Sequence, residues 1–473
     1  MTLAREPHDR DPGRMHRYTD ETERLTQAIV RYARDRMRMD PPLDAPYTPD
    51  EIREKAGVTI TTDGLGGEAA LRLFADVIAP GVVSSDHPRY LAFIPTAPTE
   101  AATLFDLVVG ASSIYGGSWL EGSGAVFAEN QALRWVADLA GMPAGAGGAF
   151  VQGGTIGNLS ALVAAREAAR ERRRAAGLPA PGRWIVAATG ESHSSIAEGA
   201  RVMDVDVLLV PGDERGRLTG EALRSALAES EAADPRALDG LFAVVATAGT
   251  TNLGTIDDLA GVADVAAERG LWLHVDGAYG GAALAAPSVR HRFAGIERAD
   301  SFIVDPHKWL FAPYDACALL YRDPSIARAA HTQHAGYLDA VAHVDGEWNP
   351  SDYAIHLTRR ARGLPFWFSL AAHGTQAYTD AIESTIELAR ETADEIRRRP
   401  YLDLIAEPEL SVVAFRRLGW GAADYARWSD RLLRSGTAFV TPSTHRGEPM
   451  TRFAIISPRT TLVELTSILA SMA

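Results

Sequence analysis

Short apolar segments alternate with helix-like segments through the middle of the chain. Five segments between about residues 90 and 330 are apolar at almost every position, which is typical of strands buried on both faces of a sheet. Ala-rich segments with helical spacing, such as residues 158–174, separate them. This alternation predicts a mostly parallel sheet covered by helices. The predicted strands are RWIVAAT (183–189), VDVLLV (205–210), LFAVVAT (241–247), LWLHVD (271–276) and SFIVD (301–305).

The two ends of the chain have different patterns. Residues 21–38 have a charged helical pattern and precede a proline-rich connector, residues 40–52. Beyond about residue 350, helical segments accompany the strand-like LSVVAFRR (410–417) and MTRFAIIS (450–457). We therefore predict three parts: an N-terminal helical arm that packs in a dimer (1–90), a large ligand-binding domain (91–350) and a small C-terminal α+β domain (351–473).

Composition and charge argue against several classes of protein. Hydrophobic residues make up 46% of the 473 residues and charged residues 23%, which is typical of a globular enzyme. The net charge of −14 argues against a nucleic-acid or anionic-membrane partner. The sole cysteine, Cys317, excludes an intrachain disulfide, and no apolar segment is long enough to span a membrane. We expect a soluble, cytoplasmic protein without nucleic-acid or membrane partners.

The first candidate site is a glycine-rich turn after a strand near residue 150. In VQGGTIGNLSAL (151–162), Gly153, Gly154 and Thr155 open a predicted helix. Backbone N–H groups at a helix start bind phosphate, and glycines let the ligand approach them closely. The alternative is an ordinary strand-to-helix turn in which Thr155 is the N-cap residue.

An acidic residue and a lysine follow two other predicted strands. Asp276 is followed by the small residues Gly277 and Ala278, which leave room for a flat ring. A carboxylate in such a poorly solvated place needs a cationic or N–H partner; the alternative is that it caps the next turn. Lys308 comes 32 residues later, about one helix and one strand, so both residues are expected at the same edge of the sheet.

Lys308 lies in the apolar segment DSFIVDPHKWLF (300–311), where lysine is unusual. Either its side chain extends outward to solvent, or its amine is used chemically. Low-dielectric surroundings lower the pKa of a lysine, and the neutral amine forms a Schiff base with an aldehyde. A phosphate site, an acidic partner for a basic ring nitrogen and an amine for an aldehyde together indicate one ligand, pyridoxal phosphate.

Four motifs resemble the group II pyridoxal-phosphate decarboxylases, and among these most closely the aromatic-L-amino-acid branch. The resemblance extends from about residue 85 to residues 458–461. It implies pyridoxal-phosphate fold type I, like aspartate aminotransferase: a mostly parallel seven-stranded sheet sandwiched by helices, a smaller C-terminal α+β lobe and an N-terminal arm. It also implies a homodimer in which the large domain binds the cofactor. The motifs are GESHSSIAEGAR (190–201), TAGTTNLGTIDDL (247–259), WLHVDGAYGG (272–281) and DPHKWL (305–310).

The resemblance also implies roles for individual residues. Lys308 is the Schiff-base lysine, Asp276 the partner of the pyridinium nitrogen, and His193 the imidazole stacked on the cofactor ring. Ala278 packs on the opposite face of that ring. Tyr337, 29 residues beyond Lys308, matches a tyrosine on a mobile loop that returns a proton after CO2 leaves. The implied catalytic residues are Lys308, His193, Tyr337 and His307, and Gly154, Thr155, Thr247 and His307 complete the cofactor-binding set.

The other histidines give no sign of a metal site. His274 lies within a predicted strand, and we interpret it as structural. His331 and His334 lack the acidic or cysteine neighbours that would complete a set of metal ligands. No metal is predicted.

A segment nearer the N-terminus is similar to the family's substrate-side segment. Phe93, Ile94, Pro95 and Thr96 match it, together with Trp119, and an apolar wall of this kind suits an aromatic side chain. For Tyr115 and Trp119 the alternative is a place in the core of an interface. Two positions depart from the aromatic branch, because Gly117 replaces a phenylalanine and Glu121 replaces a small residue. These changes either enlarge the pocket or add an acidic contact.

Three hypotheses of function follow. The first is decarboxylation of an aromatic or bulky L-amino acid to its amine and CO2 through a Lys308 Schiff base. The second is oxidative decarboxylation and deamination to an aldehyde on the same scaffold, in which phenylalanine often occupies the position of Tyr337. The third is a non-catalytic relative of the fold, which predicts a disrupted site. Arg359 and Arg360 match a family segment, and their roles stay open.

Overall fold

The computed structural model describes residues 13–43, 45–336 and 346–473, and the chain divides into two compact units between Ser84 and Ser85. The described residues of the first unit form three α-helices, none of which has a buried residue. Thr19 and Thr48 begin the first two helices with reciprocal capping boxes, which satisfy N–H groups at the helix start. The helices are α1 (Asp20–Arg38), α2 (Pro49–Ala56) and α3 (Gly67–Leu73).

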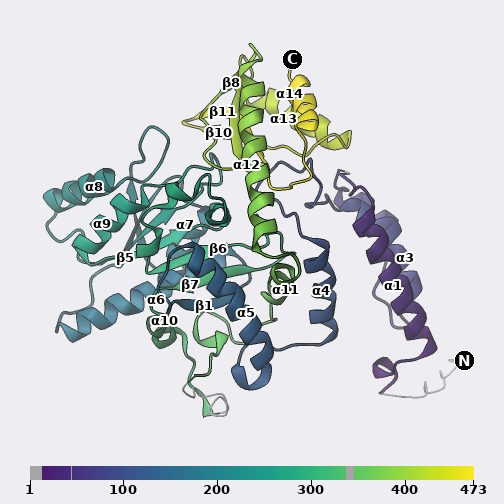
Figure 1. Ribbon diagram of the computed structural model, residues 1–473, viewed down its shortest axis with the longest axis horizontal. Coiled ribbons are helices and arrows are strands. Elements are labelled where there is room, and N and C mark those ends of the chain that lie inside the picture. The colour runs from purple at the N-terminus through teal and green to yellow at the C-terminus, as the bar shows by residue number, and fades with distance from the viewer. Residues whose placement is uncertain (1–12, 44, 337–345) are drawn as a thin grey trace, which may run out of the picture. The chain divides into compact units, whose positions relative to one another are not determined.

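The second unit is built on a seven-stranded sheet, as predicted, with the strand order β1-β7-β6-β5-β4-β2-β3 (Figure 1). All five strands predicted from apolar segments are present. Strand β7 is antiparallel to both β1 and β6, whereas the pairs among β2 to β6 are parallel. The strands are β1 (Gly147–Val151), β2 (Ile185–Thr189), β3 (Asp206–Val210), β4 (Leu241–Thr247), β5 (Trp272–Asp276), β6 (Ser301–Val304) and β7 (Cys317–Tyr321).

Alternate side chains of these strands enter two separate cores, because successive residues of a strand point to opposite faces. In β5, Leu273 and Val275 pack with helices α5, α8 and α9, whereas Trp272 packs with α6, α7 and α10. His274 and Asp276 therefore lie on the α6 side of the sheet. The helices are α5 (Trp119–Leu139), α6 (Gly154–Ala175), α7 (Ser194–Met203), α8 (Gly220–Ala233), α9 (Leu259–Arg269) and α10 (Pro324–His331).

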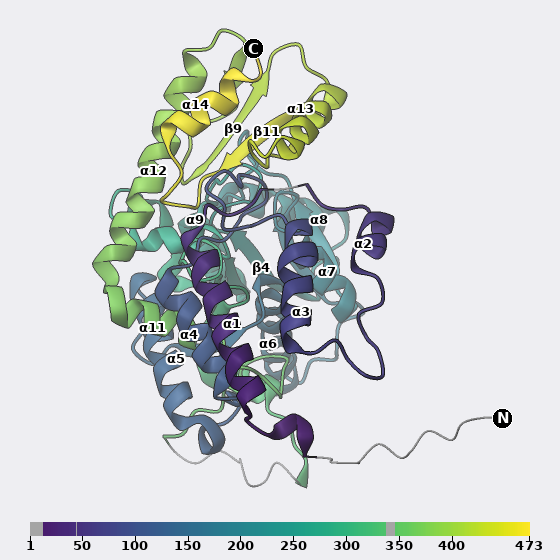
Figure 2. The same cartoon turned by 90° about the vertical axis from the view of Figure 1, so that its right-hand side faces the viewer.

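A four-stranded antiparallel sheet, in the order β10-β11-β9-β8, forms the C-terminal part. Helices α12, α13 and α14 pack with it around one core (Figure 2). Helix α12 also contributes Tyr378 and Ile382 to the core of the large sheet, so it joins the two parts. These elements are β8 (Leu402–Leu404), β9 (Val412–Arg417), β10 (Pro442–His445), β11 (Glu448–Ala454), α12 (Thr375–Arg397), α13 (Ala422–Arg434) and α14 (Leu462–Ala470).

The predicted domain boundaries at residues 90/91 and 350/351 stay predictions. No helix in the described part of the chain is long and apolar enough to cross a membrane.

A fully buried ion pair ties α5 to the segment before helix α11 (Leu364–His373). The guanidinium of Arg359 donates to both carboxylate oxygens of Glu129 at 2.7 and 2.9 Å, and the side chains are 0% and 2% exposed. The N–H of Gly363 also donates to Glu129 at 2.7 Å, and Arg359 donates to the carbonyl oxygen of Gly116. This pair gives Arg359 a structural role that its sequence pattern left open. Helix α4 (Glu100–Ala111) packs against α11 nearby.

Removing one partner of this pair should strongly destabilise the protein. Arg359→Ala leaves the Glu129 carboxylate buried without its charge partner, which typically costs about 3–5 kcal/mol. We expect that loss in urea unfolding followed by tryptophan fluorescence. Arg174→Ala is the control because it removes an exposed ion pair with Glu171 and should change stability by less than about 0.5 kcal/mol. Equal losses in the two variants would contradict the importance of the buried pair.

Candidate active site

A cavity of about 260 Å³ lies at the carboxyl ends of strands β4 and β5, beside the turn that follows β6. All eight residues predicted to bind a cofactor line this cavity, although they come from segments far apart in the sequence. In the pairing of β4 with β5, Thr247 lies directly opposite Asp276. The eight residues are Gly154, Thr155, His193, Thr247, Asp276, Ala278, His307 and Lys308.

Lys308 is paired with a carboxylate that sequence reasoning did not single out. Its Nζ lies 2.9 Å from Oδ2 of Asp305, which is 1% exposed. Burial alone would lower the pKa of Lys308, but the charge of Asp305 and its hydrogen bond outweigh burial and raise that pKa. Burial likewise opposes ionisation of Asp305, yet Lys308 keeps the pKa of Asp305 below its usual value. The prediction of a lowered lysine pKa was therefore wrong, because the charge of Asp305 raises the pKa of Lys308.

Asp276 is 4% exposed and accepts hydrogen bonds from two N–H donors. Its Oδ1 accepts the N–H of Ala278 at 3.1 Å, and its Oδ2 accepts the side-chain amide of Asn158 at 2.9 Å. The carboxylate therefore has the N–H partners that its poorly solvated position requires.

The glycine-rich turn opens helix α6 without a side-chain cap. The helix begins at Gly154, and its N-cap residue is Gly153, which supplies no side-chain hydrogen bond. The alternative in which Thr155 is the N-cap is wrong. A Cβ atom on Gly154 would lie 3.2 Å from both Ala278 and Asp305, so only glycine fits here without displacing a neighbour. The first N–H groups of α6 are thus available to an anion in the cavity.

His193 is the N-cap residue of helix α7, and its ring nitrogen Nδ1 accepts the N–H of Ser195 at 3.2 Å. His307 is buried, and its Nδ1 lies 2.7 Å from the carbonyl oxygen of Ala316. Both rings are therefore held by backbone groups on one side while they line the cavity.

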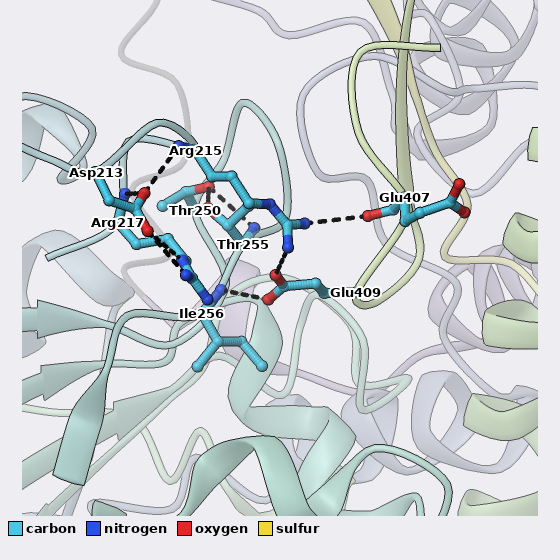
Figure 3. Close-up of polar contacts among 8 residues, drawn as sticks. All are labelled: Asp213, Arg215, Arg217, Thr250, Thr255, Ile256, Glu407 and Glu409. Atoms are coloured by element: carbon cyan, nitrogen blue, oxygen red, sulfur yellow. Dashed lines mark hydrogen bonds and ion pairs between the residues drawn. The ribbon is translucent and has the colours of Figure 1, made fainter. Parts of the chain in front are cut away.

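The loop after β4 forms part of the cavity wall and is fixed by the polar cluster in Figure 3. Glu409, 4% exposed, accepts the N–H of Ile256 at 3.0 Å and pairs with Arg215 at 2.8 Å. Arg217 pairs with Asp213 at 2.8 Å beside them. Residues of the segments 213–217, 250–256 and 407–409 thus hold one another in place.

A buried carboxylate lies directly behind Thr247. Asp257 accepts the N–H groups of Thr247 and Leu218 at 2.6 and 2.7 Å. Burial raises the pKa of Asp257 to about 7, although these two N–H groups and Arg217 act in the opposite direction. The hydrogen bond to Asp257 therefore holds the backbone of Thr247 in place, and Thr247 lines the cavity.

The predicted substrate residues lie elsewhere. Ile94 and Thr96 are buried, Phe93 is 56% exposed, and the N–H of Trp119 donates to Asn349 at 2.8 Å. None of the five predicted residues lines the 260 Å³ cavity, so their role stays a prediction. Tyr337 lies outside the described residues.

The two departures from the aromatic branch have local explanations. A Cβ atom on Gly117 would lie 2.4 Å from the hydroxyl oxygen of Tyr115, so the tyrosine occupies the space beside the glycine. Glu121 accepts the hydroxyl of Ser118 at 2.8 Å at the start of α5. Tyr115 therefore takes up space that the smaller residue would otherwise open, and Glu121 is held at a helix start.

A larger cavity, about 810 Å³, lies between α6, α9 and α10, where Trp272 begins β5. Its lining combines alanine and leucine with several charged residues, and it contains none of the predicted site residues. Chemistry rather than size therefore identifies the candidate site. Within the described ranges, no cluster of histidine, cysteine and acidic residues could hold a metal ion.

Sequence reasoning missed two residues that support the site. Asp305 lies three residues before Lys308, and a carboxylate at that spacing beside a lysine is a usable signal. Asn158 lies 118 residues before Asp276 and contacts it only because α6 packs on β5, so no local pattern could have identified it.

Comparisons with known proteins agree with this geometry. A family model described as the conserved domain of pyridoxal-dependent decarboxylases matches residues 54–418. The chain is 28% identical over 443 residues to the aromatic-L-amino-acid decarboxylase of Bacillus atrophaeus, covering 90% of this chain and 89% of the relative. It is 29% identical over 435 residues to the acidic amino acid decarboxylase GADL1 of Xenopus tropicalis, covering 87% of this chain and 83% of the relative.

A solved structure shares the whole fold. Oryza sativa TDC, solved with PLP and tryptamine, superposes with a TM-score of 0.84 at 24% identity, covering 99% of both chains. The predicted fold type I is confirmed.

The cavity residues fit the cofactor of this family. Gln152 Oε1 and Thr247 Oγ1 are buried in the cavity wall, and neither finds a hydrogen-bond partner in the described part of the chain. Unpaired buried polar atoms of this kind are costly unless a ligand completes them. A lysine amine, a buried carboxylate and free helix N–H groups are the partners that an aldehyde, a basic ring nitrogen and a phosphate require.

Neutralising Asp305 should lower the pKa of Lys308. Asp305→Asn keeps the shape of the side chain but removes its charge, so burial is no longer outweighed. We expect the rate at which the apoprotein captures pyridoxal phosphate, followed by absorbance, to reach its midpoint about 1–3 pH units lower. Asp315→Asn is the control, because Asp315 lines the same cavity but pairs with Arg362. Coinciding midpoints for wild type and Asp305→Asn would refute the proposed effect of the pair.

Proposed function

The chain belongs to the pyridoxal-dependent decarboxylase family, and from this premise we propose that it converts an aromatic or bulky L-amino acid into its amine and CO2. Family membership makes it a pyridoxal-phosphate-dependent carboxy-lyase. The observation that carries the proposal is the meeting of Lys308, Asp276 and His193 in one cavity. An intact set of this kind argues against a non-catalytic relative.

Pyridoxal phosphate, when bound, withdraws electrons from the α-carbon of an amino acid and so permits the carboxylate to leave as CO2. Lys308 would hold the cofactor through its amine. Asp276, held by two N–H donors, would face the ring nitrogen. The N–H groups at the start of α6 would bind the phosphate, together with the hydroxyl of Thr155.

Two residues are proposed to hold the ring itself. The imidazole of His193 would stack on one face, and the methyl group of Ala278 would pack on the other. Both residues line the cavity, and the N–H of Ala278 donates to Asp276. His307 would lie near the cofactor with its ring fixed by Ala316.

The proton that replaces CO2 is assigned to Tyr337. With a tyrosine here, we favour the amine product over the aldehyde product. An aldehyde synthase on this scaffold is the second candidate, and oxygen consumption distinguishes the two.

The aromatic or bulky substrate is proposed from the similarity to the Bacillus atrophaeus enzyme. Phe93, Ile94, Pro95, Thr96 and Trp119 are the proposed substrate residues. Because a relative that acts on acidic amino acids is similar to the same degree, an acidic substrate is the alternative to be tested.

We also propose that the protein is a homodimer. Helix α4 exposes Leu104, Leu107 and Val108, each about half exposed, and α5 adds Leu120 and Phe127. Apolar side chains gathered in this way are typical of a surface that is covered by a partner.

Turnover of a panel of L-amino acids by the cofactor-loaded protein should yield amine and CO2 in equal amounts, without oxygen uptake. The panel includes tryptophan, tyrosine, phenylalanine, glutamate and aspartate, and we expect the aromatic members to react faster. Lys308→Ala should lose at least about 10³-fold in rate, because it removes the covalent attachment point.

Tyr337→Phe should shift the product toward aldehyde, with ammonia and peroxide released and oxygen consumed. Aldehyde and oxygen uptake with the wild-type protein would instead identify an aldehyde synthase. Faster reaction of glutamate or aspartate would move the substrate to the acidic class.

Charging the exposed apolar face should dissociate the dimer. Leu107→Arg places a guanidinium where a partner's apolar surface is expected, and light scattering after gel filtration should show a monomer. Leu178→Arg is the control, because Leu178 is equally exposed but follows the far end of α6. A monomeric wild-type protein, or identical behaviour of both variants, would contradict this interface.

A further inference from the structure

A chain of buried hydrogen bonds runs along the α6 face of β5 toward the cavity. Trp272 Nε1 donates to the hydroxyl oxygen of Ser301 at 2.8 Å, and that hydroxyl lies 2.8 Å from His274 Nδ1. His274 Nε2 lies 2.7 Å from Oδ1 of Asn158. All four side chains are at most 4% exposed, so water does not compete for these contacts.

At Asn158 the series of hydrogen bonds divides into two branches, and each branch ends at a predicted cofactor-binding residue. Its Nδ2 group donates to Oδ2 of Asp276 at 2.9 Å and to the hydroxyl oxygen of Ser195 at 2.9 Å. The Ser195 hydroxyl in turn lies 2.9 Å from His193 Nδ1. One amide group therefore contacts the carboxylate directly and the imidazole through one hydroxyl.

The direction of every bond in the network is determined by its partners. Because the Asp276 carboxylate only accepts, the amide of Asn158 must turn its NH2 toward it and its oxygen toward His274. Burial lowers the pKa of His274 to about 4 against the opposing charge of Asp276, so the ring is neutral and carries its proton on Nε2. Nδ1 of His274 then accepts from Ser301, which leaves the Ser301 oxygen to accept from Trp272.

The second branch fixes a tautomer. Both hydrogens of the Asn158 amide are used, so the Ser195 hydroxyl accepts one of them and donates its own hydrogen to His193 Nδ1. The N–H of Ser195 donates to the same nitrogen. Nδ1 of His193 therefore accepts both hydrogen bonds, and the N–H group of the imidazole is at Nε2. Within the described residues, Nε2 of His193 has no hydrogen-bond partner, so this N–H group is available to a ligand.

We propose that Asn158, held in one orientation by His274, is a positioning residue that fixes the Asp276 carboxylate for the ring nitrogen of the cofactor and keeps His193 in its Nε2–H form. The proposal deepens the proposed function and rests on the roles assigned there to Asp276 and His193. Asn158 itself does not line up with any of the four family motifs and was not predicted from the sequence.

The expected consequence concerns the charge on the cofactor ring. Without the Asn158 donor, the Asp276 carboxylate would keep one hydrogen bond from the protein and would compete more strongly for the proton of the ring nitrogen. A ring that has lost its positive charge withdraws fewer electrons, so the Lys308 nitrogen joined to the cofactor becomes more basic. The pH midpoint of the visible absorption of bound cofactor should therefore move upward.

Two variants of Asn158 test this proposal against one matched control. Asn158→Leu removes the donors at similar volume, and Asn158→Asp keeps the shape but places a second carboxylate against Asp276. Ser160→Ala is the control, because Ser160 is buried in the same helix and bonds the N–H of Ile355 instead. Circular dichroism and thermal unfolding establish whether each variant is folded. If Asn158→Leu does not fold, Asn158→Asp alone tests the proposal.

The measurements are the dissociation constant of pyridoxal phosphate and the pH midpoint of its absorption in the holoenzyme. We expect both Asn158 variants to bind the cofactor about 10- to 100-fold more weakly, which is the range for loss of a buried hydrogen bond to a charge. We also expect the midpoint of Asn158→Leu to rise by at least about one pH unit. The dissociation constant of pyridoxal phosphate for Ser160→Ala should stay within about twofold of the wild-type value, and the pH midpoint should be that of the wild type.

Unchanged affinity and midpoint in the Asn158 variants would overturn the proposal, as would equal changes in Ser160→Ala. Wild-type protein that binds the cofactor and releases CO2 in the same experiment shows that the proposed function still stands in that case. Failure of the wild-type protein to bind the cofactor would instead overturn the function and the role of Asn158 together.

Discussion

The burial of two carboxylates, each of which needs a polar partner, governs the architecture of this site. Asp276 and Asp305 are almost fully buried at neighbouring strand ends, where an unpaired charge would be too costly to retain. Each is stabilised by a different kind of partner: Lys308 supplies a charge to Asp305, whereas Asn158 and the N–H of Ala278 supply hydrogen bonds to Asp276. Helix α6 must lie against β5 to bring Asn158 there, so the packing of the sheet and the chemistry of the site depend on the same contact.

Alternate side chains of β5 serve two purposes: one set packs in the hydrophobic core, and the other set forms the polar row that leads to the cavity. Leu273 and Val275 pack into one core and hold the sheet against α9, while Trp272, His274 and Asp276 face α6. A polar row on the buried face of a central strand is tolerated because each member is hydrogen-bonded to Ser301, to Asn158 or to both. The interpretation of His274 as structural was sound, since its ring lies inside the fold and its partners are protein groups.

Much of the fold could be predicted because parallel strands buried on both faces are apolar throughout, and the eight cofactor residues stand beside motifs at the ends of those strands. Strand β7 could not be recognised as antiparallel, because its sequence CALLY is as apolar as that of its parallel neighbours. The raised pKa of Lys308 was missed because the local sequence shows its apolar neighbours but not that Asp305 lies against its amine. Asn158 lay beyond prediction because its partners, from Ser195 to Asp276, meet it only in the folded chain.

Cys317 lies within β7 and is fully buried. Burial and the neighbouring charge of Asp305 raise the pKa of the thiol well above its usual value, so the folded protein has no reactive thiol. Because it is also the sole cysteine of the chain, a cysteine introduced anywhere on the surface would be a unique attachment point for a spectroscopic label. Conversely, modification of Cys317 by a thiol reagent would report that the sheet beneath Lys308 has opened, which makes this residue a natural sensor of global unfolding.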